Sequence, residues 1–302
     1  MSRYGKVAVL YGGTSSERNV SLKSGAAVLS ALMAQGIDAH GIDVAADLPG
    51  RLMAGRYDRA FIVLHGRLGE DGCVQGLLEV LGVPYTGSGV TASAVAMDKA
   101  LSKAVWQTAS ISTPDHVLLV SEGALATAAK LGFPLIVKPI SEGSSVGISK
   151  VRTEAELFAG YQKARAFGPV MAERCIVGHE YTCAFLGDIA FPVIRLETPR
   201  DFYDYEAKYL LDTTRYHCPS GLTAKAERAM QELARQAFLA LGARGWGRVD
   251  VMADQQGNFY VLELNTVPGM TDHSLVPMAA RAAGMSFGDL VVRILAQTLE
   301  AP

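Results

Sequence analysis

The chain has 302 residues, more than one domain usually contains, so two or three domains are expected. Hydrophobic residues make up 49% and charged residues 19%, as in globular proteins. The formal net charge of −2 argues against a nucleic acid or an anionic membrane as a partner. The 4 cysteines form no CxxC or zinc-binding spacing, and no apolar run approaches the roughly 20 residues of a membrane span. These features predict a soluble cytoplasmic protein with free thiols.

The N-terminal part of the chain alternates strand and helix patterns. Strands are predicted over 6–11 and 60–64, and helices over 20–35 and 73–81. This alternation predicts a parallel sheet, in which ligands bind at the carboxyl ends of the strands. The loops there contain neither GxGxxG nor GxxxxGK[ST], so neither a dinucleotide fingerprint nor a P-loop is expected.

Polar side chains occupy the two loops that follow these strands. They are Glu17 in the first loop and His65, Glu70 and Asp71 in the second. For each of them, helix capping or exposure to solvent is the default interpretation. Glu17 stands out because it ends a Gly/Ser loop at a helix start, where it could pair with the amine of a substrate.

The middle of the chain begins after a turn at 84–89. That turn leads into a helix predicted to contain Met97-Asp98-Lys99, and a domain boundary is expected near residue 98. Strands are predicted over 135–139 and 146–151, around a Gly/Ser loop. Successive backbone N–H groups of such a loop can bind phosphate oxygens, with the charge of Lys138 beside them. The alternative is an ordinary exposed hairpin tip.

Two more strands are predicted within 170–182, around a short break. Glu173 and Glu180 lie on them. These acids could accept hydrogen bonds from an adenine amino group and from ribose hydroxyls, or they could be surface charges. Further along, the aromatic-rich stretch 201–211 could be a packed loop or a lid, and 224–241 is an amphipathic helix.

Two alternating apolar runs, 248–253 and 259–264, predict a β-hairpin. If Gln256-Gly257 form a two-residue loop, Asp250 lies opposite Glu263, and Arg248 lies opposite Asn265. Opposed carboxylates repel, and a divalent cation removes the conflict, because Mg²⁺ binds a few carboxylates together with substrate phosphates. A solvated face with Arg248 as counter-ion is the alternative, and a loop longer by one residue would disrupt the facing.

A helical pattern over 275–282 follows the hairpin, with Ser274 or Asp272 as its N-cap. Its N-terminus attracts anions. A cation site for phosphates would therefore lie beside an amide site for a carboxylate. This combination predicts chemistry that joins ATP to a carboxylic acid.

In the order of their motifs, these pieces closely resemble the D-alanine–D-alanine ligase family of the ATP-grasp superfamily, over essentially the whole chain. The motifs that carry the resemblance are YGGTSSERNVSL (11–22), LHGRLGEDG (64–72), PYTGSG (84–89), MDK (97–99), IVKPISEGSSVG (136–147), YDYEAKYL (203–210), GWGRVDVM (245–252) and LELNTVPGMTDHSLVP (262–277).

The resemblance implies an α/β fold, α+β in its ATP-grasp part, with three domains. These are an N-terminal parallel-sheet domain at 1–98, a central ATP-grasp domain at 99–180 and a C-terminal ATP-grasp domain at 181–302 that carries an ω-loop. ATP is held in this family between two antiparallel sheets, one from the central and one from the C-terminal domain.

The resemblance also implies the roles of individual residues. Asp250, Glu263 and Asn265 would bind two Mg²⁺ ions, with Mn²⁺ as an alternative metal. Arg248 and the Gly269 amide would stabilise the tetrahedral intermediate. The remaining residues with implied roles are Lys99, Lys138, Ser145, Glu173, Ile176, Glu180 and Lys208 for the nucleotide, Glu17, Ser144 and Tyr209 as a hydrogen-bonded trio over the substrates, and His65, Ser274 and Leu275 for the amino acids.

The implied activity is ATP-dependent joining of two D-alanines through an acyl phosphate, for peptidoglycan precursor synthesis and the cell wall. The alternative is another ATP-grasp carboxylate–amine or carboxylate–hydroxyl ligase, such as a D-alanine–D-lactate ligase, although Tyr209 favours an amine nucleophile. The expected partners are D-alanine, ATP and a second copy of the chain in a homodimer, with no nucleic acid or membrane. A non-catalytic nucleotide-binding protein and an NAD-dependent oxidoreductase are disfavoured by the complete residue set and the missing fingerprint.

Overall fold

The computed structural model describes residues 3–143, 146–198 and 214–300. Its N-terminal part is a parallel sheet of order β2-β1-β3. The fully apolar centre of β1 lies in the core, and strands that alternate with helices pair in parallel, as predicted. The elements are β1 (Val7–Gly12), α1 (Arg18–Ala34), β2 (Ala39–Val44), α2 (Leu48–Gly55), β3 (Arg59–Ile62) and α3 (Cys73–Val80).

Two helices, α4 (Val90–Met97) and α5 (Lys99–Thr108), lead out of this part of the chain. The expectation of one helix through Met97-Asp98-Lys99 is wrong. Asp98 adopts an extended conformation, and its carboxylate accepts hydrogen bonds from the backbone N–H groups of Ala100 and Leu101. Asp98 is therefore the N-cap of α5, and Lys99 is the first residue of that helix.

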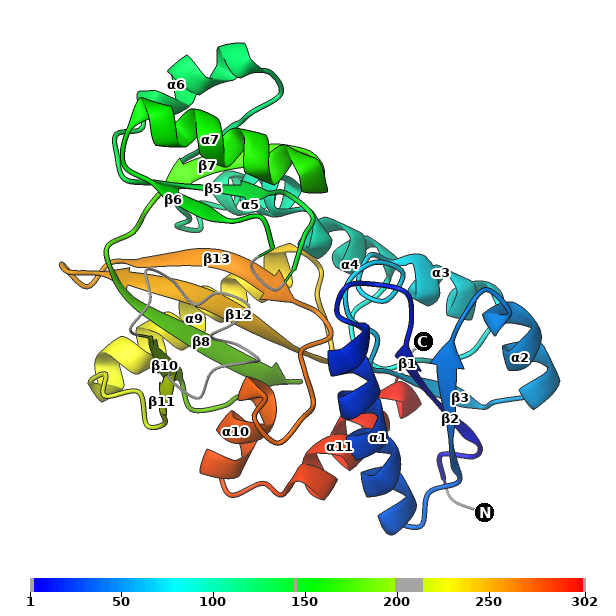
Figure 1. Cartoon of the computed structure of the whole chain (residues 1–302). Helices are drawn as coiled ribbons and strands as arrows, with labels where there is room; N and C mark the ends of the chain where they lie inside the picture. The colour runs from blue at the N-terminus through cyan, green and yellow to red at the C-terminus, as the bar shows by residue number, and fades with distance from the viewer. Residues whose placement is uncertain (1–2, 144–145, 199–213, 301–302) are drawn as a thin grey trace.

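The second sheet has four antiparallel strands in the order β4-β7-β5-β6. The helices α6 and α7 cover it in Figure 1 and share its apolar core. Its last strand is shorter than the predicted run over 146–151. The elements are β4 (His116–Leu118), η1 (Glu122–Ala124), α6 (Leu125–Ala129), β5 (Leu135–Pro139), β6 (Ser149–Val151), α7 (Glu154–Ala164), η2 (Arg165–Phe167) and β7 (Val170–Arg174).

The third sheet has six strands, in the order β11-β10-β8-β12-β13 with β9 paired to β8. Helix α9 packs against β8, β12 and β13, and Figure 1 shows the four-stranded sheet standing over this one. The elements are β8 (Gly178–Leu186), β9 (Ile189–Ala190), β10 (Ile194–Glu197), β11 (Arg215–His217), α9 (Ala224–Ala240), β12 (Trp246–Asp254), β13 (Phe259–Asn265), α10 (Leu275–Ala282), α11 (Phe287–Ala296) and η3 (Gln297–Leu299).

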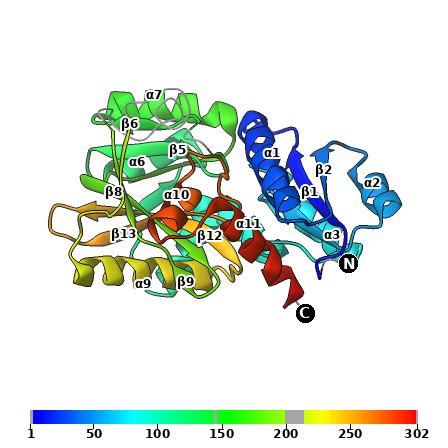
Figure 2. The ribbon, with the colours of Figure 1, turned by 90° about the horizontal axis from the view of Figure 1, so that it is seen from below.

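Helix α11 joins the C-terminal part of the chain to the N-terminal part, because it packs against both α10 and α1. Figure 2 shows α11 running between the two. Among the described residues, no single helix is long and apolar enough to cross a membrane. One pair of helices, Leu275–Ala282 with Phe287–Leu299, is together long and apolar enough for a membrane span by length and composition only, and the pair is bent by 106°.

Candidate active site

The hairpin β12–β13 has the predicted register where it carries polar side chains. Asp250 lies opposite Glu263, and Arg248 lies opposite Asn265. Opposed residues share one face of a sheet, so the acids, the amide and the guanidinium are on the same face. The prediction that the two acids lie on one face is confirmed.

The turn of this hairpin differs from the prediction. Asp254 and Asn258 close the turn through a backbone hydrogen bond, which leaves a loop one residue longer than expected. A register shift between Asp250 and Val251 compensates, because Leu262 is an extra, unpaired residue on β13. The bulge therefore restores the pairing of Asp250 with Glu263, which the longer loop alone would have shifted by one residue.

Asp250 is held by donors from three sides. Its Oδ1 accepts hydrogen bonds from the Thr182 hydroxyl at 2.6 Å and from Arg248 Nε at 2.8 Å. Its Oδ2 accepts from Arg248 Nη2 at 2.7 Å and from Asn265 Nδ2 at 3.2 Å. Because Asn265 turns its amide nitrogen toward Asp250, its amide oxygen is directed away from the carboxylate.

By their chemistry, the carboxylate oxygens of Asp250 and Glu263 and the amide oxygen of Asn265 are donors of the kind that Mg²⁺ accepts. Within the described ranges, no cluster of three or more His, Cys, Asp and Glu side chains could hold a metal. The hairpin thus offers two carboxylates and one amide, which suits a hard cation that takes its other ligands from water and phosphates. A closed, all-protein metal cage does not fit this donor set.

Lys99 connects Glu263 to the loop after β5. Its ammonium lies 3.2 Å from Glu263 Oε2 and donates a hydrogen bond of 2.8 Å to the carbonyl of Glu142. Lys99 begins α5, so the break at Asp98 is what aims this cation between the hairpin and the Gly/Ser loop. A phosphate group bound there would lie next to the ammonium of Lys99 and the carboxylate of Glu263.

Glu173, on β7, is the centre of a buried ionic cluster. Its Oε1 lies 2.5 Å from Lys138 Nζ on β5, and its Oε2 lies 2.9 Å from Lys103 Nζ on α5. Burial raises the pKa of Glu173, but the charges of the two lysines outweigh it and hold that pKa at about 2. Burial lowers the pKa of Lys103 to about 8, against the opposing effect of Glu173.

The two oxygens of Glu173 differ in their hydrogen bonding. Lys138 donates a hydrogen bond to Oε1. Oε2 faces Lys103 as an ion pair, and no donor from the described part of the chain is aligned on it. A buried carboxylate oxygen without an aligned donor suits a ligand that brings an N–H group, as the amino group of adenine does.

The other predicted nucleotide residues lie along the segment that follows Glu173. Ile176 is in the break between β7 and β8, and Glu180 is on β8, opposite Leu196 and Met252. Both are partly exposed. The segment passes from the four-stranded to the six-stranded sheet, so these two residues lie where the sheets are joined.

Glu17 brings the N-terminal loops to this region. It precedes α1 without capping it through its side chain. A methyl group added at Gly143 would lie 2.8 Å from Glu17 Oε2, and one added at Gly66 would lie 3.2 Å from the same atom. Glycine at 143 and at 66 therefore lets the Gly/Ser loop and the His65 loop approach this carboxylate closely.

His65 is buried and carries its proton on Nδ1. That nitrogen lies 2.9 Å from the carbonyl oxygen of Val267, which can only accept a hydrogen bond. Burial holds the pKa of His65 below its usual range, so the ring is neutral near pH 7. Nε2 is then an acceptor, and no donor among the described residues reaches it.

Glu70 lies in the same loop, where the sequence indicated a capping or exposed acid. It accepts a hydrogen bond from the Gly66 N–H at 2.5 Å. Burial, followed by the charge of Glu17, raises the pKa of Glu70 to about 8, although Arg248 opposes the shift. Glu70, Glu17, His65 and Arg248 thus influence one another electrostatically across two sheets.

The start of α10 closes this group of residues. Ser274 is the N-cap by position, but its hydroxyl accepts a hydrogen bond from the Thr271 N–H at 2.9 Å instead of capping the helix. A methyl group at Gly269 would lie 2.8 Å from Ser274 Oγ. Leu275 begins the helix, so its N–H belongs to the unpaired donors of the first turn.

Four predicted residues, Ser144, Ser145, Lys208 and Tyr209, lie outside the described residues. Two others were missed: Lys103 and Thr182. Lys103 is four residues after Lys99 on α5, so the i, i+4 spacing of the two lysines was an available signal. Thr182 gave no signal, because it meets Asp250 only through the pairing of β8 with β12.

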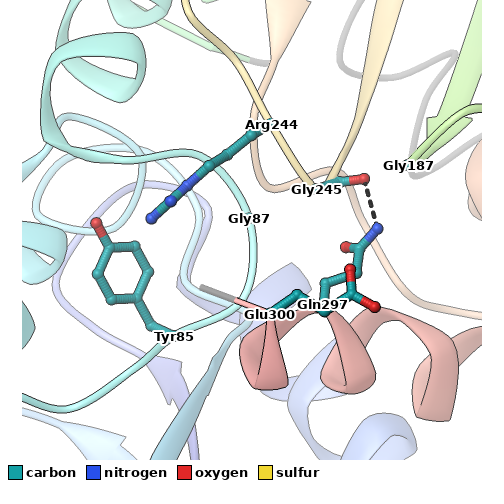
Figure 3. Close-up of a pocket in the computed structure, with 7 residues that line it drawn as sticks. All are labelled: Tyr85, Gly87, Gly187, Arg244, Gly245, Gln297 and Glu300. Atoms are coloured by element: carbon teal, nitrogen blue, oxygen red, sulfur yellow. Dashed lines mark hydrogen bonds between the residues drawn. The ribbon is translucent and has the colours of Figure 1, made fainter. Parts of the chain in front are cut away.

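A separate cavity of about 240 Å³ is drawn in Figure 3. Arg244 reaches toward Tyr85 on one side of it, and Gln297 donates a hydrogen bond to the Gly245 carbonyl on the other. None of the predicted site residues lines this cavity, which lies between the N-terminal sheet and the C-terminal end of the chain.

The chain is similar to known proteins both in sequence and in structure. A family model described as the D-ala D-ala ligase C-terminus matches residues 86–296, and one described as the D-ala D-ala ligase N-terminus matches 51–88. The D-alanine–D-alanine ligase of Stutzerimonas stutzeri (strain A1501) is 59% identical over 300 residues, which cover 99% of this chain and 96% of the relative.

Two solved structures are similar over nearly their whole length. The D-alanine–D-alanine ligase from Bacillus anthracis complexed with ATP has a TM-score of 0.84 and 32% identity, and the match covers 98% of both chains. The VanG D-Ala:D-Ser ligase from Enterococcus faecalis has a TM-score of 0.85 and 30% identity, with coverage of 98% of this chain and 100% of the other.

Proposed function

Because the chain belongs to the D-alanine–D-alanine ligase family, we propose that it joins two D-alanine molecules into D-alanyl-D-alanine with the consumption of ATP, for peptidoglycan precursor synthesis. The observation that carries this proposal is the hairpin: Asp250 faces Glu263, with Arg248 and Asn265 on the same face. Acid oxygens for a metal and a guanidinium for a developing anion lie there side by side.

The nucleotide would lie between the four-stranded and the six-stranded sheets. Glu173 Oε2 would accept a hydrogen bond from the adenine amino group, and Glu180 would accept from the ribose, next to the backbone of Ile176. Lys99 and Lys138 would contact the phosphates, together with Ser145 and Lys208. Two observations support this arrangement. Glu173 Oε2 has no hydrogen-bond donor aligned on it within the described residues, and the ammonium of Lys99 lies beside Glu263.

Asp250, Glu263 and Asn265 would hold Mg²⁺, or Mn²⁺ in its place, with two ions in all. The metal would neutralise the charge of the phosphate oxygens during transfer. The chain's own contribution is to keep the acids aligned, which the bonds from Thr182 and Asn265 to Asp250 achieve.

In the first step, the carboxylate of one D-alanine attacks the γ-phosphorus, and ADP leaves, so that an acyl phosphate forms. Glu17 would pair with the ammonium of this D-alanine. Acyl phosphates react with water, so the trio of Glu17, Ser144 and Tyr209 would close the site before transfer.

In the second step, the amine of another D-alanine attacks the acyl carbon, and phosphate leaves. Arg248 and the Gly269 N–H would meet the negative charge that develops on the carbonyl oxygen, where loss of one donor typically costs about 10²–10³ in kcat. Ser274 and the Leu275 N–H would hold the second carboxylate. The bare Nε2 of neutral His65 would accept a hydrogen bond from an amine.

The test is phosphate release from ATP and Mg²⁺ with D-alanine, with L-alanine as the control. We expect release with D-alanine only, and a product of the mass of the dipeptide. Replacing the second substrate by D-lactate or D-serine separates the alternative ligases, and a preference for either would correct the acceptor. An absence of D-alanine-dependent phosphate release would overturn the proposal.

The homodimer and the cytoplasmic location stay predictions. The proposed mechanism needs neither, because every residue that it uses belongs to one copy of the chain. The division into three domains at 98 and 180 is also a proposal, and limited proteolysis with sequencing of the fragments would test it.

A further inference from the structure

Lys103 is a buried lysine that the proposed mechanism does not use. Its side chain has no solvent-exposed surface. The ammonium has three oxygen neighbours: Glu173 Oε2 at 2.9 Å, Thr113 Oγ1 at 2.7 Å and the Pro114 carbonyl at 3.3 Å. Lys103 donates hydrogen bonds to Thr113 and Pro114 and faces Glu173 as an ion pair, and these partners allow a charged group to remain inside the protein.

The position of Lys103 is fixed from the six-stranded side of the molecule. On the same helix, Trp106 donates a hydrogen bond of 2.9 Å to the Ala237 carbonyl of α9. The Thr113 hydroxyl that accepts from Lys103 itself donates to the Val261 carbonyl of β13, at 2.8 Å. Lys103 therefore contacts Glu173 of the four-stranded sheet, while hydrogen bonds to α9 and β13, on the side of the six-stranded sheet, hold its surroundings in place.

Lys103 determines what Glu173 can do. Lys138 alone would pair with one oxygen, and the carboxylate group could still rotate about the Cγ–Cδ bond of Glu173. With Lys103 on the opposite side, each oxygen has its own lysine, so the plane of the carboxylate is set. Glu173 then accepts hydrogen bonds and donates none.

We propose that Lys103 is a positioning residue that fixes Glu173 as an ionised acceptor, and that it thereby makes the nucleotide site select a purine with a 6-amino group over one with a 6-oxo group. This inference rests on the proposed function only for the identity of the nucleotide. A 6-amino group donates to the carboxylate, whereas a 6-oxo group places a second acceptor against it.

Lys103 is not needed for packing alone. Removing one partner of a buried ion pair usually destabilises a protein, but in Lys103→Met the Glu173 carboxylate keeps Lys138, 2.5 Å away, as its counter-ion. The loss of the lysine should therefore leave the helix in place and change the recognition of the base.

The experiment measures equilibrium binding of ATP and of inosine triphosphate, with Mg²⁺ and without D-alanine, by calorimetry. Inosine triphosphate differs from ATP at the 6-position. Selectivity is the dissociation constant of inosine triphosphate divided by that of ATP. For Lys103→Met we expect this ratio to fall about tenfold or more, as for the loss of a hydrogen bond to a charged group. Lys225→Met, an exposed lysine on α9, is the matched control and should keep the wild-type ratio. An unchanged ratio in Lys103→Met would overturn the inference.

A double variant tests whether Lys103 acts through Glu173. Glu173→Gln should lose the same discrimination, and adding Lys103→Met to it should lose little more. If the two losses were additive, Lys103 would act independently of Glu173, and the inference would be wrong.

A third measurement does not depend on the folding of the methionine variant. The charged groups that face Lys103 are Glu173 on β7, Lys138 on β5, and Asp115 with His116 at β4. Because the pKa of Lys103 is about 8, ATP binding by the wild type should weaken as the pH rises above 8. Lys103→Arg keeps its charge, so its ATP affinity should stay flat over the same range. Identical pH profiles would contradict the inference.

Failure of this inference is distinguishable from failure of the proposed function. Binding of the two nucleotides is measured without turnover. A wild type that prefers ATP but releases no phosphate with D-alanine would overturn the ligase and keep the role of Lys103. An active ligase whose preference for ATP survives Lys103→Met would keep the proposed function and overturn the role of Lys103.

Discussion

Asp250 accepts hydrogen bonds on both of its carboxylate oxygens, from Thr182, Arg248 and Asn265. This network holds the carboxylate in one orientation before any ligand arrives. Groups that orient a metal ligand are part of the metal site's function, because they remove the cost of ordering it on binding. Thr182 is thus a supporting residue of the proposed site.

At the residue scale, the first prediction concerns the acids of the hairpin. Asp250→Asn and Glu263→Gln should each lower kcat on the order of a thousandfold or more, because the neutralisation of phosphate charge by a metal supplies several kcal/mol. Steady-state phosphate release with D-alanine measures this. Asp254→Asn, on the same strand but at the turn, should keep its activity; retained turnover in both of the first variants would contradict the metal assignment.

The second prediction concerns Glu70. Its pKa is raised from 4.5 to about 8 in the folded protein. Between these two values the folded state holds a proton that the unfolded state releases, so the contribution of Glu70 to stability is present below pH 4.5 and is lost as the pH rises through 8. Urea denaturation at pH 5 and pH 8 should show a larger loss of stability for the wild type than for Glu70→Gln. Parallel losses would refute the shift.

Glu70 and Lys103 also show where sequence reasoning ends at this scale. Both have long side chains of types that are mostly exposed, and nothing in their neighbours along the chain indicates burial. Glu70 is half-buried, and the charges that act on its pKa come from distant parts of the chain: Glu17 in the first loop of the parallel sheet and Arg248 on the six-stranded sheet. Asp250 and Glu263, in contrast, were predictable, because their relation is set by one hairpin.

At the scale of elements, the hairpin shows why a correct register was reached through a wrong turn. The predicted pairing assumed a two-residue loop, and the observed loop is one residue longer with a bulge at Leu262. Two deviations of one residue cancel at Asp250. The alternation of apolar side chains on β12 and β13 set the facing, whereas the place of a bulge depends on packing that the sequence does not display.

The third prediction concerns the cap of α5. Asp98→Ala removes the acceptor for the Ala100 and Leu101 N–H groups, so the free energy of unfolding should fall by about 1 kcal/mol. Asp98→Asn should change stability far less, because its amide oxygen can still cap the helix. Urea denaturation of the two variants checks this, and equal losses would show that the charge of Asp98, not its capping bond, matters.

At the scale of the whole molecule, the proposed site is assembled from all three sheets. Glu17 and His65 come from the loops of the parallel sheet, Lys138 and Glu173 from the four-stranded sheet, and the hairpin from the six-stranded one. A hydrogen bond of 3.1 Å from the Met270 N–H to Ser24 Oγ ties the last region to the first. Strand and helix patterns predicted the parallel sheet and the C-terminal hairpin, whereas only the family resemblance implied two antiparallel sheets with the nucleotide between them.

The fourth prediction concerns ligand binding across these sheets. A non-hydrolysable ATP analogue with Mg²⁺ should raise the melting temperature, since a ligand at 100 times its dissociation constant stabilises the folded state by about 2.7 kcal/mol. A chelator should remove most of this increase in the wild type. In Asp250→Asn the chelator should have little effect; an equal effect in both proteins would place the metal elsewhere.

The bulge at Leu262 separates the hairpin into an outer half and an inner half. Gln255, Gln256 and Gly257 are exposed at the tip of the outer half, so we expect insertions there to leave the pairing of Asp250 with Glu263 unchanged. The tip of the hairpin is therefore the natural place to insert an epitope or to attach a fluorophore, because the acids should remain in register.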